Sequence, residues 1–451
     1  MLFPLKWLVI LIIVSHHIRL VNKQNNISTR FFFNCANCMF IFLSFPFLPS
    51  KNCIAQKTDT VSSDHYLEVE LGGGYYLNSN AITTEFTSFF YKGGFITPEV
   101  KDRVQDKLKY SNRIGGDLDY GISIAWKPDS LWHKNNLSLN FSLKDRFHYD
   151  AGFSRDFFNV VMYGNKSYAG QTADLGNFTL NFLRYQQLRA GLEWEGDTAR
   201  GSYGISLSVL KGENNFIIDA DRAFLTTSSD GTKIDFDLAM SMRQTDTAQL
   251  GPGAFNGIGT STDFFYEMPY LTWYNEGLLR LEVNDFGFIR WNTNSVYYHM
   301  DSIYHYDGIE INNLLDLQNN ALPNGNPDSL LKNNVKYGTE PYTTLIPAVF
   351  TVTATTYYGK KFIFEKGMRF RMSSNCKPYY YAAFSCYFTK QFLATVTTSY
   401  GGYGNLNAGI ELEYMFPKQF KLHLDSYYLT GYLIPKKFSA QGISIGLSKR
   451  F

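Results

Sequence analysis

Apolar and polar residues alternate with a period of two along most of the chain. The alternation is plain in five stretches, at positions 117–126, 136–144, 188–194, 203–209 and 406–416. Their apolar phases are Leu118, Tyr120, Ile122, Ile124 and Trp126; Leu137, Leu139, Phe141 and Leu143; Leu188, Ala190, Leu192 and Trp194; Tyr203, Ile205, Leu207 and Val209; and Leu406, Ala408, Ile410, Leu412, Tyr414 and Phe416. This period is typical of strands with one apolar face, and about ten residues suit a tilted strand that crosses a bilayer. The pattern predicts an all-β protein, since no stretch has a long helical periodicity.

The last ten residues follow the same rule. One phase reads Ile443, Ile445, Leu447, Lys449 and Phe451. A soluble edge strand could show this pattern, so it is the repetition along the chain that favours a barrel. The segment resembles the C-terminal signal of bacterial outer-membrane barrels in its polar Ser444, its Gly446 and its terminal Phe451. Lys449 departs from the aromatic or apolar residue that is usual in that signal.

Length and composition favour one large β unit. A chain of 451 residues suggests about three domains, yet no linker or shift of composition divides it after residue 60. Aromatic residues make up 17% of the chain, and many stand at predicted strand ends, as at Tyr357–Tyr358, Tyr379–Tyr381 and Tyr427–Tyr428. Aromatic girdles at two membrane interfaces explain this distribution. We predict that residues 56–451 form a single transmembrane antiparallel β-barrel.

Residues 1–55 are predicted to be a leader region that is removed on export. Its two apolar runs, of which Met39–Leu48 is the longer, are both shorter than a membrane-spanning helix. The small residues Cys53 and Ala55 form a small-x-small cleavage pattern, so cleavage is expected near Ala55/Gln56. A membrane anchor is the alternative, and export follows from either interpretation.

The charge balance gives no support to nucleic-acid binding. Five of the 42 Lys and Arg residues and none of the 40 acids fall within residues 1–55, so the rest of the chain carries 37 bases and 40 acids. A nearly neutral chain lacks the basic surface that binds a phosphate backbone.

The five cysteines do not predict a disulfide framework. Cys35, Cys38 and Cys53 fall within the leader region, and the Cys-x-x-Cys spacing of the first two has no second pair that would complete a metal site. Cys376 and Cys386 are ten residues apart on what the pattern predicts to be one strand. About 33 Å would then separate them, so they should not bridge each other.

The predicted turns sort into short and long connections. Counted back from Phe451, the predicted external connections are Leu429–Ala440, Gly401–Gly404, Ser373–Lys377 and Asp301–Pro347, and the predicted periplasmic turns are Pro417–Gln419, Thr389–Lys390 and Gly359–Lys360. Short periplasmic turns are typical of outer-membrane barrels. Across the turn Pro417–Gln419, we expect Phe416 to pair with Phe420, which places Glu413 opposite His423 in the lumen.

Two short helices are predicted in the connections. Thr97 can cap a helix that begins at Pro98. The apolar residues of this helix share one face and are Val100, Val104 and Leu108. A second amphipathic segment, Ile309–Leu317, lies in the long external connection. Either helix can pack into the lumen or lie over the rim.

No group of residues forms a recognisable catalytic motif. The histidine and aspartate residues that share one phase near position 300 are His299, Asp301, His305 and Asp307. A metal or acid/base site is conceivable there, but such a row is more often a wet polar face at a barrel rim. Gly72–Gly74 and Gly401–Gly404 lack the strand-to-helix context of phosphate loops and are interpreted as turns or curved strand. We predict no enzyme, and no catalytic, cofactor-binding or metal-ligating residue.

Two further stretches carry a family resemblance. Glu282–Trp291 and Tyr306–Ile311 resemble an uncharacterised family of Bacteroidota outer-membrane β-barrel proteins. That family is itself similar to the fatty-acid-transporter (FadL-like) barrels and to barrel subunits of the type IX secretion system. The resemblance covers most of residues 60–451 and implies about 14 strands, within a range of roughly 12–16, with loop material near the lumen.

Two classes of function fit these observations. The first is a barrel in the bacterial outer membrane that passes or shelters small hydrophobic compounds through a partly plugged lumen. The second is a structural or secretion-system accessory barrel that binds partner proteins through its external loops. The expected partners are outer-membrane lipid, the barrel-assembly machinery through the strand that ends at Phe451, and a small hydrophobic ligand or secretion-system proteins, but no nucleic acid.

Overall fold

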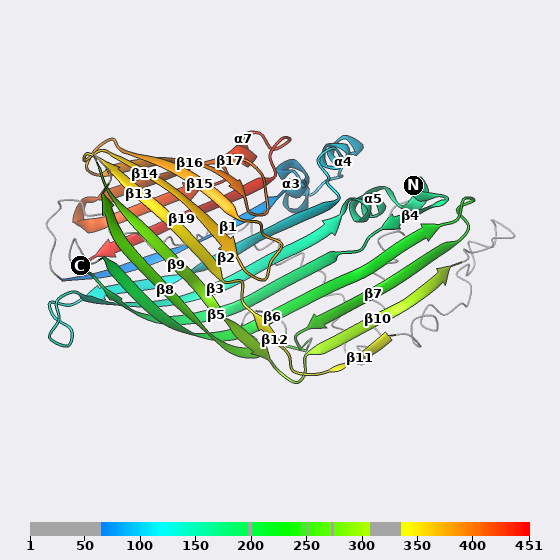
Figure 1. The fold of residues 1–451 in the computed structure, drawn as a ribbon, viewed down its shortest axis with the longest axis horizontal. Coiled ribbons are helices and arrows are strands. Elements are labelled where there is room, and N and C mark those ends of the chain that lie inside the picture. Colours follow the sequence, from blue (N-terminus) through cyan, green and yellow to red (C-terminus); the bar gives the residue numbers. More distant parts are fainter. Residues whose placement is uncertain are drawn as a thin grey trace.

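One antiparallel sheet closes on itself to form the molecule (Figure 1). The computed structural model describes residues 65–196, 201–246, 248–249, 251, 253–271, 275–306 and 335–451. Fourteen strands form the closed ring, in which β1 pairs with β2 on one side and with β19 on the other. In ring order they are β1 (Tyr66–Ser79), β2 (Ser111–Lys127), β3 (Leu137–Ser154), β5 (Phe178–Trp194), β6 (Ser202–Thr227), β8 (Gly257–Leu271), β9 (Glu276–Trp291), β13 (Val349–Tyr358), β14 (Phe362–Arg371), β15 (Tyr379–Tyr387), β16 (Phe392–Gly401), β17 (Asn407–Phe416), β18 (Phe420–Ser426) and β19 (Ala440–Arg450). The prediction of an all-β barrel with about 14 strands is confirmed.

Side chains alternate between the outside of the barrel and its lumen. On β6, the outward Leu207 is 64% exposed and the inward Ser208 is 2% exposed; on β16, the outward Val396 is 60% exposed and the inward Thr397 is 4% exposed. Because the period is two, one register fixes the whole inner and outer set of each strand. The outer surface is therefore apolar and the inner surface is mostly polar.

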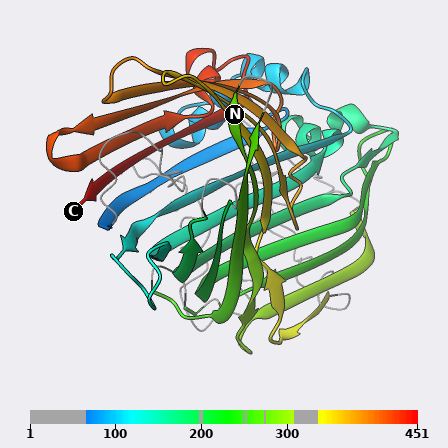
Figure 2. The same cartoon turned by 60° about the vertical axis from the view of Figure 1, so that its left-hand side comes forward.

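A side sheet rises from the ring at β6 (Figures 1 and 2). β6 has 26 residues; its first half pairs with β8 from Ser202 to Gly212, and its second half pairs with β7 from Phe216 to Thr227. β7 in turn pairs with β10. The strands outside the ring are β4 (Gln171–Asp174), β7 (Ile234–Gln244), β10 (Val296–Tyr306), β11 (Val335–Thr339) and β12 (Thr343–Leu345). β6 thus belongs to both the barrel wall and the side sheet.

Short helices gather at the barrel end opposite to the C-terminus (Figure 1). They are α3 (Thr84–Lys92), α4 (Pro98–Gln105), α5 (Arg155–Tyr163), the single-turn η1 (Asn165–Tyr168) and α7 (Leu429–Leu433), while η3 (Pro417–Gln419) forms the β17–β18 turn at the other end. Thr83 and Ser154 cap α3 and α5, because their hydroxyl oxygens accept hydrogen bonds from the N–H groups of Phe86 and Phe157. Among the described residues, no helix is long and apolar enough to cross a membrane.

The predicted α4 helix exists. Val100, Val104 and Leu108 are 4%, 0% and 3% exposed and pack in one cluster with residues of α3 and α5. The predicted apolar face is confirmed for Val100 and Val104, whereas α4 ends at Gln105 and Leu108 follows it. Thr97 occupies the N-cap position, but its side chain makes no capping hydrogen bond, and the prediction was wrong on that point. The predicted leader of residues 1–55, with its cleavage site, and the predicted helix Ile309–Leu317 lie outside the described residues.

The predicted turns from position 359 onward separate the strands β13 to β19, to within two residues. Since consecutive strands are antiparallel, the three short turns lie at the end where β19 finishes, and the three longer connections lie at the other end, here called the loop end. Phe416 pairs with Phe420, and Glu413 pairs with His423. The predicted register of this hairpin is confirmed.

Two predictions about connections were wrong. The segment Asp301–Pro347 was expected to be an irregular loop, but β10 extends to Tyr306, and β11 and β12 lie between Val335 and Leu345. Strand pairing to β7 and β9 recruits these residues into the sheet. Cys376 and Cys386 were expected on one strand, but Cys376 lies in the β14–β15 connection; both are free thiols.

Two adjacent residues of β17 test which side chains face outward and which face the lumen, when each is replaced by arginine. Ile410 faces outward and Glu411 faces the lumen. We expect Ile410→Arg to destabilise the barrel in bilayers by about 2–4 kcal/mol more than Glu411→Arg, because a lipid-facing charge near the midplane is costly. Urea unfolding in lipid vesicles measures the difference. Equal stability of the two variants would show that the faces are reversed.

The ring closes at the last residue. The N–H of Phe451 donates to the carbonyl oxygen of Leu67 at 2.8 Å, and the ammonium group of Lys449 lies 4.3 Å from the centre of the Phe451 ring. We expect deletion of Phe451 to lower the yield of folded, heat-modifiable barrel, since both the hydrogen bond and the ring contact at the seam are lost. Phe451→Tyr is the matched control and should fold like the wild type; an unchanged yield after the deletion would contradict this role.

Candidate functional site in the barrel lumen

Charged side chains form a network on the lumen wall, with Asp285 of β9 at its centre. Asp285 has φ of +58° at a β-bulge between β8 and β9. Its carboxylate accepts hydrogen bonds from Arg146 at 2.5 Å, Arg189 at 3.0 Å and Gln187 at 2.9 Å, while its own N–H donates to Asp263 at 2.6 Å. Arg189 also forms an ion pair with Asp263 at 2.8 Å. Two arginines therefore balance two aspartates, as buried charges require.

A second ion pair joins opposite walls of the barrel. Six strands separate β2 from β14 in either direction around the ring, yet the guanidinium of Arg371 on β14 makes two contacts to the carboxylate of Asp117 on β2, at 2.5 and 2.9 Å. His148 Nδ1 lies 2.6 Å from the same carboxylate, and the hydroxyl of Tyr76 donates to it at 2.7 Å. The two-pronged arginine contact is the strongest geometry for such a pair, and it crosses the lumen.

The β14–β15 connection also reaches the far wall. The N–H of Asn375 donates to the carboxylate of Asp150 on β3 at 2.9 Å. Its side-chain amide donates to the same carboxylate at 2.5 Å and to the hydroxyl of Thr179 on β5 at 2.8 Å. This connection therefore folds inward over the loop end of the lumen.

The β16–β17 connection folds inward as well. The guanidinium of Arg113 on β2 donates to the carbonyl oxygens of Gly402 at 2.9 Å and Gly404 at 3.1 Å. Tyr403 between them is 2% exposed, and its ring lies so close to Gly115 that a Cβ there would come within 2.3 Å. Only glycine at position 115 permits this contact.

A cluster of large apolar side chains covers the lumen face of β5, β6 and β9, beyond the Asp285 network along the same strands. Its members are 0–6% exposed and are Leu183, Tyr185, Leu210, Ile289 and Trp291, together with Tyr342 and Ile346 from the segment that leads into β13. The indole of Trp291 lies across Gly212 and Gly257, where a Cβ would come within 2.5 and 2.8 Å of the ring. Its N–H donates to Thr344 at 2.8 Å. An apolar wall thus interrupts the otherwise polar lumen.

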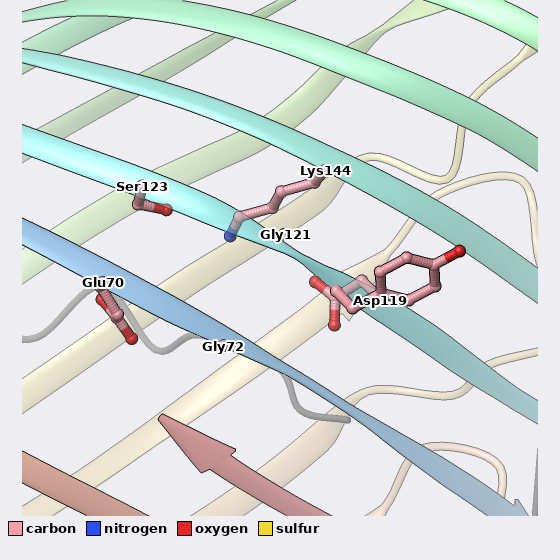
Figure 3. A pocket seen from close by; sticks show the side chains of 7 residues that line it. Glu70, Gly72, Asp119, Gly121, Ser123 and Lys144 are labelled. Carbon is pink, nitrogen blue, oxygen red and sulfur yellow. The ribbon is translucent and has the colours of Figure 1, made fainter. Parts of the chain in front are cut away.

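A small hollow lies on the lumen face of β1, β2 and β3 (Figure 3). It is lined by Glu70, Gly72, Asp119, Tyr120, Gly121, Ser123 and Lys144. Two carboxylates and one ammonium group make its walls polar, unlike the mostly apolar sites that bind small organic molecules.

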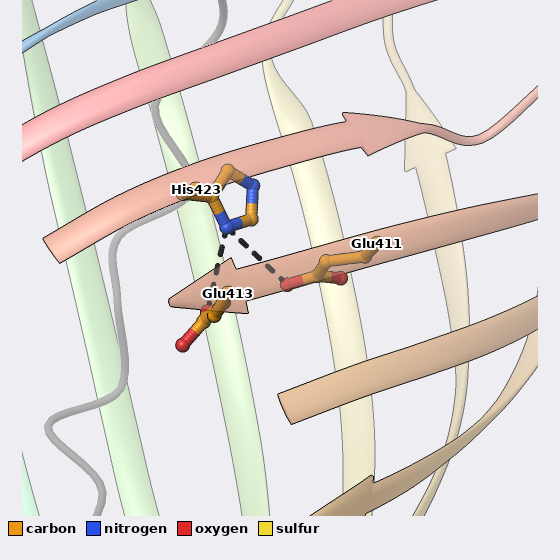
Figure 4. Close-up of side chains that lie close together, drawn as sticks. All are labelled: Glu411, Glu413 and His423. Carbon is orange, nitrogen blue, oxygen red and sulfur yellow. Dashed lines mark ion pairs between the residues drawn. The ribbon is translucent and has the colours of Figure 1, made fainter. Parts of the chain in front are cut away.

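The hairpin of β17 and β18 carries a cluster of three ionisable side chains on its lumen face (Figure 4). His423 Nδ1 lies 3.4 Å from the carboxylate of Glu413 and 3.6 Å from that of Glu411. On the other side of the ring, His423 Nε2 lies 3.5 Å from the carboxylate of Asp425. The sequence placed Glu413 opposite His423, and the structure adds two more carboxylates to that pair.

The polar row noted in the sequence lies on β10 in the side sheet, where its side chains are exposed. The row consists of His299, Asp301, His305 and Asp307, of which the last lies outside the described residues. Asp301 pairs with Arg222 at 2.6 Å, and His305 pairs with Asp235 at 2.6 Å. Separate partners hold these side chains, so the described members of the row do not converge on one point.

The sequence did not reveal the contacts that cross the lumen. Asp117 and Arg371 are 254 residues apart, and their meeting depends on the positions of their strands in the ring, which no local pattern encodes. The bulge at Asp285 had a weak signal, because Asn284–Gly287 interrupts the alternation of β9.

Comparisons with solved structures return β-barrels of the outer-membrane type. A TodX monoaromatic hydrocarbon channel with the deltaS2S3 mutation is 8% identical at a TM-score of 0.44, covering 86% of this chain and 90% of that one. The toluene transporter TodX of Pseudomonas putida is 8% identical at a TM-score of 0.39, covering 85% and 88%. The translocator domain of the autotransporter NalP from Neisseria meningitidis is 8% identical at a TM-score of 0.34, covering 86% and 88%.

Comparisons at the sequence level give one match. No curated protein matches the chain. The pattern of a family of unknown function, DUF5723, matches residues 60–425, which include every strand from β1 to β17 and nearly all of β18. The chain therefore belongs to the DUF5723 family, whose function is unknown.

Proposed function

We propose that this protein is an integral barrel of the bacterial outer membrane that passes or shelters small hydrophobic compounds, and that inward-folded connections narrow its lumen. The proposal includes export with a leader of residues 1–55. It also includes assembly through the strand that ends at Phe451. The membrane location is supported by the outward side chains, since residues such as Leu207 of β6 and Val396 of β16 expose apolar surface on strands far apart in the ring.

The narrowing is supported by contacts between distant walls. Arg371 reaches Asp117, Asn375 reaches Asp150, and the carbonyl groups beside Tyr403 are held by Arg113. Each contact joins the β14–β17 side of the ring to the β2–β3 side. Together they favour a closed or gated lumen over a wide aqueous channel.

The observation that carries the proposal is the apolar cluster around Trp291. Barrels that conduct ions are polar inside, whereas this wall places the buried Leu210 and Ile289 beside the indole of Trp291 on the lumen face. Sites for small organic molecules are mostly apolar with a few polar groups, and the Asp285 network supplies such groups along the same strands. The names of the similar solved structures cover both hydrocarbon channels and an autotransporter translocator, so the proposal rests on the geometry of this chain.

Single-channel recording tests the closed lumen. We expect wild-type protein in planar bilayers to show no large steady conductance, and the double variant Arg371→Ala/Asn375→Ala to conduct, because two of the three cross-lumen contacts are lost. Arg222→Ala is the matched control: Arg222 is part of an exposed ion pair in the side sheet and should leave the protein silent. A large steady conductance of the wild type would contradict the proposal.

Ligand binding tests the apolar wall. We expect folded protein in detergent to bind toluene or a medium-chain fatty acid, and Leu210→Asn to weaken that binding about tenfold, since a polar group at the wall costs about 1.4 kcal/mol of binding free energy. Ser206→Asn, on the same face of β6, is the control and should bind like the wild type. Equilibrium dialysis measures the binding. If Leu210→Asn and Ser206→Asn bind the probe equally well, the apolar wall is not the binding site.

The alternative function, a secretion-system accessory barrel that binds partner proteins, is favoured by one feature. The side sheet of β6, β7 and β10 extends beyond the ring (Figure 2). It exposes charged residues such as Arg243 of β7, which pairs with Glu340 after β11. Silence in bilayers together with no binding of either hydrophobic probe would favour this alternative.

A further inference from the structure

We infer that the lumen face of the β17–β18 hairpin is a binding site for a divalent transition metal ion such as Zn²⁺, with Glu411, Glu413 and His423 as ligands. These residues offer one nitrogen and two oxygen atoms within 4.8 Å of one another. All three stand on rigid strands, since Glu413 and His423 are direct cross-strand partners and Glu411 lies two residues along the same face. Figure 4 shows the imidazole directed at both carboxylates.

The distances suit ligands around a metal ion better than direct hydrogen bonds. His423 Nδ1 lies 3.4 Å from one glutamate oxygen and 3.6 Å from the other, whereas an N–H···O hydrogen bond is about 2.7–3.2 Å long. Bonds from Zn²⁺ to nitrogen and oxygen of about 2.1 Å, at tetrahedral angles, place two ligand atoms about 3.4 Å apart. The observed spacing therefore leaves room for the ion between them.

His423 itself needs a partner. It is 8% exposed, and neither ring nitrogen makes a hydrogen bond within the described structure. A buried polar atom without a partner is costly. With Nδ1 on the metal, Nε2 would carry the proton and face the carboxylate of Asp425 at 3.5 Å. A carboxylate behind a metal-bound histidine is the usual arrangement that fixes its tautomer.

The acidic residues also favour a cation. Glu411 and Asp425 are direct cross-strand partners, 7% and 3% exposed, and like charges in that position repel each other. A divalent ion offsets this repulsion. The competing explanation is a protonated histidine shared among the carboxylates, which would make the cluster an ion-pair network only.

Two glycines and a further carboxylate lie beside His423. Gly446 of β19 is the cross-strand partner of His423, and Gly72 of β1 is the partner of Gly446. The carboxylate of Glu70 lies over these two glycines, since a Cβ at Gly446 or Gly72 would come within 3.1 or 3.5 Å of its Oε1. Three protein ligands leave a fourth tetrahedral position for water.

Titration of the full chain, folded in detergent after treatment with a chelator, tests the inference. We expect calorimetry to show one Zn²⁺ bound per chain, and Co²⁺ to give the intense visible absorption of tetrahedral coordination. His423→Gln and Glu413→Gln should each weaken Zn²⁺ binding at least tenfold, and Asp425→Asn should weaken it about 10–100-fold through the orientation of His423. Lys421→Gln, on the same face of β18, is the matched control and should bind like the wild type.

Thermal unfolding provides a second measurement, and its wild-type part does not depend on the folding of any variant. Saturating Zn²⁺ should raise the unfolding midpoint of the wild type, because the ion binds the folded state, and it should not raise that of Glu413→Gln. No shift in the wild type, or the same affinity in the wild type and His423→Gln, would overturn the inference and leave an ion-pair network only.

Discussion

Closure of the ring is the constraint on which the rest of the structure depends. In a bilayer no water is present to pair with backbone N–H and C=O groups, so a sheet has to pair its first strand with its last. Here β1 and β19 form that seam over eleven residue pairs, from Glu68 with Arg450 to Asn78 with Ala440. Once the seam is fixed, the period of two sends each side chain either outward to lipid or inward to the lumen.

The inward side chains then have to satisfy one another. Charges are costly in a narrow lumen unless they are paired, and the pairs found here draw on residues from several strands. Asp285 collects two arginines, and Asp117 meets Arg371 from the opposite wall. The connections that carry Asn375 and Tyr403 follow the same route across the lumen. The apolar wall around Trp291 is the part of the lumen that takes no part in this pairing, and in the proposed function it contacts the hydrophobic molecule.

The sequence predicted what depends on local periodicity. Strand faces, the register of Glu413 with His423 and the apolar face of α4 all follow from spacings of two to four residues, and all three are confirmed. The side sheet was missed because β6 continues past the barrel wall, and nothing in its alternation marks where β8 is replaced by β7 as its partner.

The candidate sites also differ in whether local periodicity could predict them. The ligand set of Glu411, Glu413 and His423 could have been found in the sequence, since the confirmed register places all three on one face. Beyond the leader region, the sequence pattern was interpreted for a metal site only at the row from His299 to Asp307, and at the hairpin it predicted only the pairing of Glu413 with His423. The ion pair between Asp117 and Arg371 could not have been found, because it depends on the number of strands that separate β2 from β14.

The central claim is that the lumen is bridged from wall to wall at Asp117 and Arg371. A double-mutant cycle measures this contact most directly, from the unfolding free energies of the wild type, Asp117→Asn, Arg371→Gln and the double variant in lipid vesicles. Our account predicts a coupling energy of about 1–3 kcal/mol, because each single variant leaves a partly buried charge without its partner. Additive effects, within about 0.5 kcal/mol, would show that the two side chains do not meet and would contradict the account.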